Sequence, residues 1–171
     1  MWETIAADAA AESQVWADAL FPEAERAGEP VFSNLAPPEL GLGVETIYEG
    51  YLVHYGRSRL FSPLDADVAL LLGDYLYAHG LVRVAETGNV AAVVDLAELI
   101  SLCSQARCEG RDGDGAAWAA TAALLGRGGL GDARDAMRLG RSTRALEQIA
   151  RESAGDDSVD AALAAHARFL R

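Results

Sequence analysis

The chain has 171 residues, of which 51% are hydrophobic, a size and composition that predict one folded domain and exclude a disordered chain. Fourteen arginines and no lysine stand against 26 acidic residues, and the resulting net charge of −12 repels phosphate backbones, so we expect no nucleic-acid binding. No apolar run reaches the roughly 18 residues of a membrane span and no signal-peptide pattern is found, so we expect a cytoplasmic protein without a transmembrane segment.

Residues 1–21 are expected to contain one amphipathic helix. Apolar side chains recur among acids at helical spacing, at Trp2, Ile5, Ala9, Val15, Trp16 and Leu20. Residues 22–43 then hold four of the five prolines, which predicts an extended connector. The first helix is thereby separated from the rest of the chain, and we expect it to pack either on its own domain or on a partner.

Residues 44–171 are expected to form a helical domain that starts with a helix over 44–55. Within this helix, Glu45 and Glu49 form an i, i+4 carboxylate pair. Two acids at this spacing can hold a divalent metal ion, but the same pattern is more common on a solvated helix face, which is the interpretation we favour.

The loop that follows carries Arg57 and Arg59. Arginine binds phosphate oxygens in a bidentate manner, so this pair can hold a diphosphate. The alternative, which the sequence supports at least as well, is that the arginines form ion pairs with Glu45, Glu49 or Asp65.

Residues 65–110 form the stretch around which we expect the bundle to be built. Two helices are predicted, over 65–87 and 89–107, because apolar residues recur at i, i+3, i+4 and i+7. Both are apolar on more than one stripe, which is typical of central bundle helices. The Gly88-Asn89 pair between them predicts a helix stop and a short turn, hence an antiparallel hairpin.

Beyond the hairpin we expect a short helix over 116–125 and a longer one over 132–153. The longer helix carries a run of arginines at near-helical spacing, Arg134, Arg138, Arg141 and Arg144. This run predicts one basic stripe on an otherwise acidic protein, which is either a partner surface or a solvated face paired with acids.

The last helix is expected to begin after Gly155, at the acids Asp156, Asp157 and Asp160. Their spacing matches the DDxxD pattern, in which carboxylates at i, i+1 and i+4 bind magnesium diphosphates. Acids are also preferred at a helix N-terminus, as caps and as partners of the helix dipole, and we favour that interpretation.

The order of features between Val44 and Ser153 resembles the all-α trans-isoprenyl (polyprenyl) diphosphate synthase family. The most specific match is ADVALLLGDYLYAHGLVRVAETGN, which is similar to the family's AVLLGDYLLA helix and includes Gly73 and Asp74. LAELISLCSQARCEG stands in the place of the family helix that ends in GExxQ, AATAALL resembles KTAxL without its lysine, and LGRSTRALEQIA resembles the helix before the second aspartate motif. The resemblance covers about two-thirds of the chain and implies a helical bundle like the central part of the synthase fold.

The catalytic motifs of that family are missing or displaced in this chain. The first aspartate motif falls close to Tyr48, Glu49 and Leu52, where only Glu49 is acidic. The second falls just after Ile149, where the chain reads ARESA. The family's chemistry needs two facing aspartate motifs that hold about three magnesium ions and stabilise the departing diphosphate. The resemblance therefore implies a degenerate member.

The function we favour is a non-catalytic subunit that acts as an accessory, regulatory or structural partner in a larger assembly, without a cofactor. In the family the helices that match 65–87 and 89–107 form the dimer interface. The resemblance therefore implies a homo- or hetero-oligomer, formed with a second copy, with a catalytic prenyl synthase or within a large enzyme complex.

Two alternatives follow from the same resemblance. One is a module that binds a prenyl tail, such as that of a quinone or another lipid, in the family's hydrophobic tunnel, lined here by Tyr51, Leu72, Leu76 and Ile100. The other is a Mg²⁺-dependent prenyltransferase or terpenoid enzyme. Its candidate catalytic residues are Glu45, Glu49 and Asp74, its candidate metal ligands are Asp156, Asp157 and Asp160, and its diphosphate-binding remnant is Arg57 and Arg59.

Overall fold

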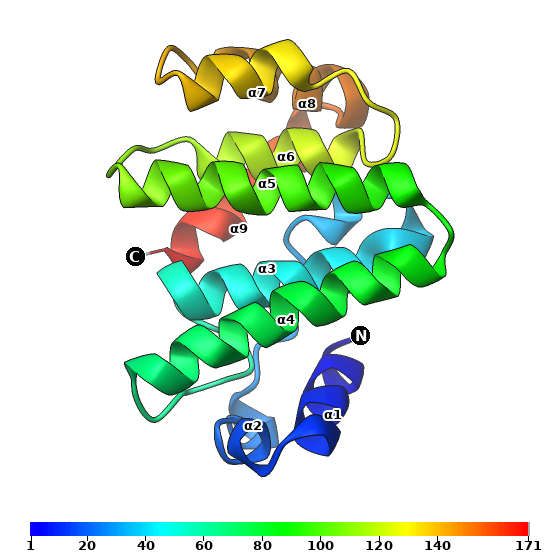
Figure 1. Cartoon of the computed structure of the whole chain (residues 1–171). Helices are drawn as coiled ribbons and strands as arrows, with labels where there is room; N and C mark the ends of the chain where they lie inside the picture. Colours follow the sequence, from blue (N-terminus) through cyan, green and yellow to red (C-terminus); the bar gives the residue numbers. More distant parts are fainter. Residues whose placement is uncertain (171) are drawn as a thin grey trace.

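The computed structural model describes residues 1–170, so Arg171, the last residue of the predicted helical domain, lies outside the described residues. Within residues 1–170 the chain forms nine α-helices and three short 3₁₀ turns without a β-strand, which confirms the predicted all-α class (Figure 1). The α-helices are α1 Trp2–Glu12, α2 Gln14–Asp18, α3 Gly41–Tyr55, α4 Ala66–Glu86, α5 Val90–Cys108, α6 Asp114–Ala123, α7 Gly131–Arg138, α8 Arg144–Ala154 and α9 Asp156–Phe169. The 3₁₀ turns are η1 Glu23–Glu25, η2 Ser33–Leu35 and η3 Pro38–Leu40.

The helices are arranged in layers (Figure 1). α5 and α6 run through the middle of the molecule, with α7 and α8 on one side and α3 and α4 on the other. α1 and α2 lie at the end of the molecule farthest from α7. α9 packs against α6 and α8, and its last residues reach the end of α3.

The predicted antiparallel hairpin is present as α4 and α5. Asp65 caps α4, since its Oδ1 accepts a hydrogen bond from the backbone nitrogen of Val68 at 2.8 Å. Asn89 caps α5 in the same way by accepting from Ala92 at 3.0 Å. Gly88 has a φ of 77°, the left-handed conformation that a helix stop needs. Local backbone chemistry thus defines the start and the turn of the hairpin.

The prediction that both hairpin helices are central to the bundle is wrong for α4. Only five of its 21 residues are buried, namely Leu72, Gly73, Leu76, Gly80 and Val84. By length and composition alone, α4 is also the one helix among residues 1–170 that is apolar enough to cross a membrane. The apolar pattern of α4 indicated burial on several sides. Among the described residues, however, no element covers the side of α4 that faces away from α3.

α3 and α4 pack with their backbones in close contact through two pairs of glycines. Gly43 faces Gly80 and Gly50 faces Gly73, so each helix carries glycines seven residues apart. A methyl group on Gly80 would lie 3.0 Å from the carbonyl oxygen of Gly43, and one on Gly50 would lie 2.9 Å from that of Gly73. Larger residues would force the helices apart, so these glycines set the interhelical distance.

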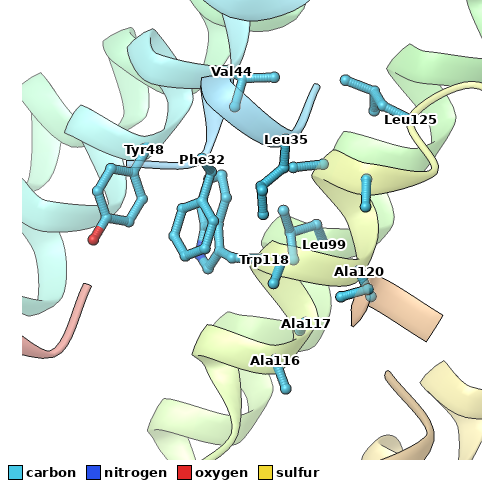
Figure 2. Close-up of a cluster of buried hydrophobic side chains, with 14 of the residues drawn as sticks. Phe32, Leu35, Val44, Tyr48, Leu99, Ala116, Ala117, Trp118, Ala120 and Leu125 are labelled. Atoms are coloured by element: carbon cyan, nitrogen blue, oxygen red, sulfur yellow. The ribbon is translucent and has the colours of Figure 1, made fainter. Parts of the chain in front are cut away.

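Two hydrophobic clusters hold the helices together. The larger one joins the 31–40 segment to most of the helices, and Figure 2 shows its centre, where Phe32 and Trp118 stack with ring centroids 5.4 Å apart. The smaller one joins α1 and the loop before α4 to α4 itself, through Ile5, Ala9, Leu60, Phe61, Leu72 and Leu76. The N-terminal helices therefore pack on their own domain, which was one of the two predicted arrangements.

Three predicted helix boundaries are corrected by the structure. Residues 2–21 form two helices, because the chain breaks at Ser13. Residues 132–153 also form two helices, broken around Gly140, whose φ of 67° ends α7. α3 begins at Gly41, inside the predicted connector, where the 3₁₀ turn η3 leads directly into it.

Candidate functional site

The predicted acid pair of α3 is buried. Glu45 and Glu49 have no exposed side-chain surface, so the interpretation as a solvated helix face is wrong. Oε1 of Glu45 accepts hydrogen bonds from three consecutive backbone nitrogens, those of Val31, Phe32 and Ser33, at 2.8, 3.0 and 2.9 Å. This carboxylate fixes the segment that enters η2 to the side of α3.

Glu49 holds the loop after α3 in the same way. Its Oε1 accepts from Ser58 Oγ at 2.5 Å and from the backbone nitrogens of Arg59 and Leu60 at 2.8 and 2.9 Å. Both loops run through the interior, where backbone N–H groups without acceptors are costly. The two carboxylates supply the acceptors that regular secondary structure would otherwise provide.

Arg59 bridges the two carboxylates. Its Nη1 lies 2.6 Å from Oε2 of Glu45 and its Nε lies 2.8 Å from Oε2 of Glu49, while the rings of Trp2 and Tyr48 cover the guanidinium at 4.5 and 5.0 Å. Burial alone would lower the pKa of Arg59, but the charges and hydrogen bonds of the two glutamates raise it. The ion-pair interpretation of Arg59 is confirmed, and these contacts leave its guanidinium enclosed.

Arg57 is separate from this cluster. Its Nη2 donates to the carbonyl oxygen of Arg168 at 2.8 Å, and its backbone nitrogen donates to that of Phe169 at 2.8 Å, at the end of α9. The side chain borders a surface cavity of about 470 Å³, which also includes Phe169 and the 57–63 loop. Arg59 also lines this cavity, but its guanidinium is held by the two glutamates and that of Arg57 by α9, so the two arginines do not converge on one anion.

Within the part of the chain that the structure describes, the acidic residues do not form a metal site. Among residues 1–170, no group of three His, Cys, Asp or Glu side chains is placed to hold a metal ion. Glu45 and Glu49 do not fit magnesium, because their oxygens already accept hydrogen bonds from the protein. The three magnesium ions of the family chemistry thus have no matching ligand set in the described residues.

The acids at the start of α9 lie at a helix N-terminus, as predicted. Asp156 and Asp160 pair with Arg151 at 3.3 and 2.7 Å, and Asp157 is exposed in the first turn. The predicted capping role is wrong in detail, since no side-chain capping hydrogen bond forms at this end. The acids contribute through ion pairs and through the helix dipole.

The arginine run over 132–153 does not form one continuous stripe, but two of its members pair with acids, as one of the two interpretations predicted. Arg134 is buried and donates to Asp95 of α5 at 2.9 Å, and Arg138 pairs with Glu98 of α5 at 2.7 Å. The break between α7 and α8 separates these two from the rest of the arginine run. The arginines of α7 therefore attach that helix to α5 and do not form a partner surface.

A second buried polar cluster, which the sequence analysis missed, lies where α3, α5, α6 and α9 meet. Tyr51 and Arg107 both donate to Asp114, and His166 Nε2 lies 3.6 Å from the same carboxylate, with Nδ1 2.9 Å from the hydroxyl of Tyr48. Burial would raise the pKa of Asp114, but the nearby imidazole of His166, the hydrogen bond from Tyr51 and the charge of Arg107 lower it. The side chains of Asp114 and His166 are only 8% and 6% exposed, so we assign the cluster a structural role.

The four residues predicted to line an apolar tunnel lie in two different clusters. Tyr51 belongs to the larger hydrophobic cluster and Ile100 packs against it, whereas Leu72 and Leu76 belong to the smaller one beside α1. In the described part of the chain these side chains pack against their neighbours and do not surround one shared cavity.

The outer sides of α4 and α5 carry most of the exposed large apolar side chains. Leu70, Leu71, Val82, Val90 and Val94 are between 54% and 71% exposed. In Figure 1 the two helices lie at the front of the molecule and meet at the turn on the right. We define the hairpin face as the exposed residues Asp67, Leu70, Leu71, Asp74, Ala78, Val82 and Ala85 of α4 and Val90, Ala91, Val94 and Ala97 of α5.

Asp74 lies in the middle of the α4 part of the hairpin face, apart from the buried Glu45 and Glu49. Its side chain is 65% exposed, and Oδ1 lies 3.3 Å from Nε2 of His54 in α3. Burial lowers the pKa of His54 more than the neighbouring Asp74 raises it. The neutral form of the imidazole is therefore favoured over the charged form.

Comparison of the chain with protein-family models, with curated proteins and with solved structures finds no match. The resemblance to the isoprenyl diphosphate synthase family therefore rests on the sequence motifs quoted above. The structure adds the all-α architecture and the position of each candidate residue within it.

Proposed function

We propose that the chain is a non-catalytic helical subunit that joins a larger protein assembly through its hairpin face. The observation that carries this proposal is the exposure of Leu70, Leu71, Val82, Val90 and Val94 on two adjoining helices. Monomeric proteins rarely leave a large contiguous apolar surface open to water, and such surfaces mark binding sites. The resemblance, in which subunits pair through these same helices, implies a second copy, a catalytic prenyl synthase or a large enzyme complex as the partner.

The size of the two helices suits a stable interface. α4 and α5 have 21 and 19 residues, which is roughly 30 Å for each at about 1.5 Å per residue. A specific interface takes about 800 Å² from each partner, roughly a tenth of the 8036 Å² surface of this chain. The exposed sides of two helices of this length and about 10 Å in width, which meet at their turn and diverge from it (Figure 1), supply an area of that order.

The positions of the candidate catalytic residues support a non-catalytic role. Glu45 and Glu49 hold two loops and are neutralised in part by Arg59, whereas Asp74 lies on the outer surface. Departure of a diphosphate needs carboxylates that are free to hold magnesium ions against it. The prenyl-tail alternative gains no support either, because its four predicted lining residues are packed in separate clusters.

The proposal is tested by purifying the full-length chain from its source cells under native conditions, identifying the co-purifying proteins, and rebuilding the complex from separately purified components. Leu71→Glu places a charge on the hairpin face at a position that is 60% exposed, and Leu139→Glu does so outside that face at a position that is 64% exposed. We expect Leu71→Glu to weaken the rebuilt complex by at least about tenfold, because the new carboxylate is buried without a partner.

The control variant Leu139→Glu is expected to bind as the wild type does. A rebuilt complex that tolerates both substitutions equally contradicts the proposal. So does a solitary chain that releases diphosphate from an allylic diphosphate when magnesium is added.

A further inference from the structure

The charges on the hairpin face have one sign. Asp67 and Asp74 are exposed among apolar residues of α4. The arginines that lie on the inner sides of the two helices are bound within the chain: Arg83 pairs with Asp8 of α1, and Arg107 pairs with an acid of α6. Within the described residues, the face therefore offers a partner apolar side chains and carboxylates but no cation.

A second copy of the chain is a poor occupant of this face. The exposed positions of α4 form one stripe from Asp67 to Ala85, with Asp74 near its centre. If two copies pair antiparallel about that centre, the two Asp74 residues are separated by about four residues, roughly 6 Å along the axis. A parallel symmetric pair places them opposite each other. Like charges brought together in an apolar contact repel, and each copy adds a net charge of −12.

A membrane is a poor occupant for a related reason. α4 has the length and composition of a membrane-crossing helix, but its inner side is fixed against α3 by the glycine pairs. Its outer side carries Asp67 and Asp74. The hydrocarbon core excludes unpaired carboxylates, and anionic headgroups repel them.

We infer that the hairpin face binds a different protein chain, whose apolar helical surface carries arginine or lysine side chains opposite Asp74 and Asp67. This inference rests on the proposed function and names the chemistry of the partner. Leucine and valine side chains separated by alanines form ridges and grooves that fit another helix. A cation that reaches Asp74 within such a contact makes a charge-assisted hydrogen bond, and complementary charge favours this partner over a second copy.

The test uses the full-length chain, with a charge-reversed version of itself as the mimic of the partner. Asp67→Lys/Asp74→Lys presents the same apolar face with two cations. Asp132→Lys/Asp157→Lys makes the same change in net charge at exposed acids outside the face. Circular dichroism establishes that each variant is folded, and sedimentation equilibrium then measures self-association of each chain and the association of each variant with the wild type.

We expect the wild type alone and the face-reversed variant alone to be monomeric, because like charges meet in each self-pair. The wild type mixed with Asp67→Lys/Asp74→Lys is expected to form a 1:1 complex, whereas the wild type mixed with Asp132→Lys/Asp157→Lys is expected not to associate. Raising the salt concentration from about 0.05 M to about 0.5 M should weaken the mixed complex at least about tenfold, since salt screens the paired charges.

A wild-type dimer that Leu71→Glu dissociates would overturn the inference, because a second copy would then cover the face, but the proposed subunit role would stand. A mixture of wild type and face-reversed chain that stays monomeric would also overturn it. If the wild type floats with phosphatidylglycerol vesicles and Leu71→Glu abolishes the flotation, the hairpin face binds a membrane and the inference is overturned. Failure of the proposed function would give a different result, namely a complex with the native partner that Leu71→Glu does not weaken.

Discussion

Arg59 donates to Glu49 from its side chain and from its backbone: Nε lies 2.8 Å from Oε2, and the backbone nitrogen lies 2.8 Å from Oε1. The same guanidinium reaches Glu45, so one buried cation lies between two buried carboxylates. The cluster has one negative charge in excess. The backbone N–H groups that also donate to the two carboxylates stabilise that excess, which explains how three charged groups remain buried together.

Replacing Arg59 by Met should strongly destabilise the protein. Two carboxylates would be left buried without their cation, and breaking such a buried pair costs about 3–5 kcal/mol. The measurement is the free energy of unfolding in urea. Arg141→Met, at an exposed arginine, is the matched control and should change stability by no more than about 0.5 kcal/mol. Equal stability of the two variants would show that the cluster does not hold the loops in place.

Alanine at Gly80 should destabilise the contact between α3 and α4. The added methyl group would lie 3.0 Å from the carbonyl oxygen of Gly43, which belongs to the backbone and cannot move without shifting a helix. Overpacking of this kind costs about 1–3 kcal/mol. Gly131→Ala is the control, because no atom lies within 4 Å of a methyl group there, and it should be neutral or stabilising by up to about 1 kcal/mol. Urea unfolding distinguishes the two, and a stabilised Gly80→Ala variant would contradict the packing argument.

Two adjacent leucines of α4 should respond differently to truncation. Leu72 is 0% exposed, and Leu72→Ala is expected to cost about 2–5 kcal/mol of stability through lost burial and a cavity. Leu71 is 60% exposed, and Leu71→Ala should change the free energy of unfolding of the isolated chain by no more than about 0.5 kcal/mol. A large loss at Leu71 in the isolated chain would mean that the hairpin face is covered within the chain itself.

Acid should destabilise the protein partly through Asp114. Its pKa in the folded chain is lowered below the unfolded value of about 4, so the folded state favours the carboxylate. The corresponding stabilisation is complete above the unfolded pKa and is lost as the pH falls towards the folded pKa. We expect the free energy of unfolding to decrease between about pH 5 and about pH 2, with a shallower decrease in Asp114→Asn. The exposed control Asp157→Asn should keep the wild-type slope, and equal slopes in all three proteins would contradict the assignment.

Features whose cause lies within a few neighbouring residues were predictable from the sequence. Asp65, Gly88 and Asn89 act on backbone groups no more than three residues away, and the hairpin they delimit is present. Gly140 carried a similar local signal, a glycine two residues after Arg138, and a helix was nevertheless predicted through it. The seven-residue spacing of Gly43 and Gly50 is also visible in the sequence, although close helix packing was not predicted from it.

Features that depend on distant residues were not predictable. The groups that donate hydrogen bonds to the buried Glu45 and Glu49 lie between 9 and 14 residues away along the chain. The i, i+4 spacing of the two acids therefore carries no information about these donors. The cluster around Asp114 draws on four helices, and no short pattern marks it. Helical periodicity identified the apolar stripes of α4, but periodicity is the same whether a stripe meets its own chain or another one.

The backbone contact between α3 and α4 has a consequence for association. Glu45 and Glu49 fix two loops to α3, and α4 cannot slide along α3 without bringing larger side chains against the glycine backbones. The helix that carries Leu70, Leu71 and Asp74 is therefore held in one arrangement before any partner arrives. Association at α4 then orders few additional backbone torsions, so little backbone conformational entropy is lost on binding, and this lower cost favours a higher affinity.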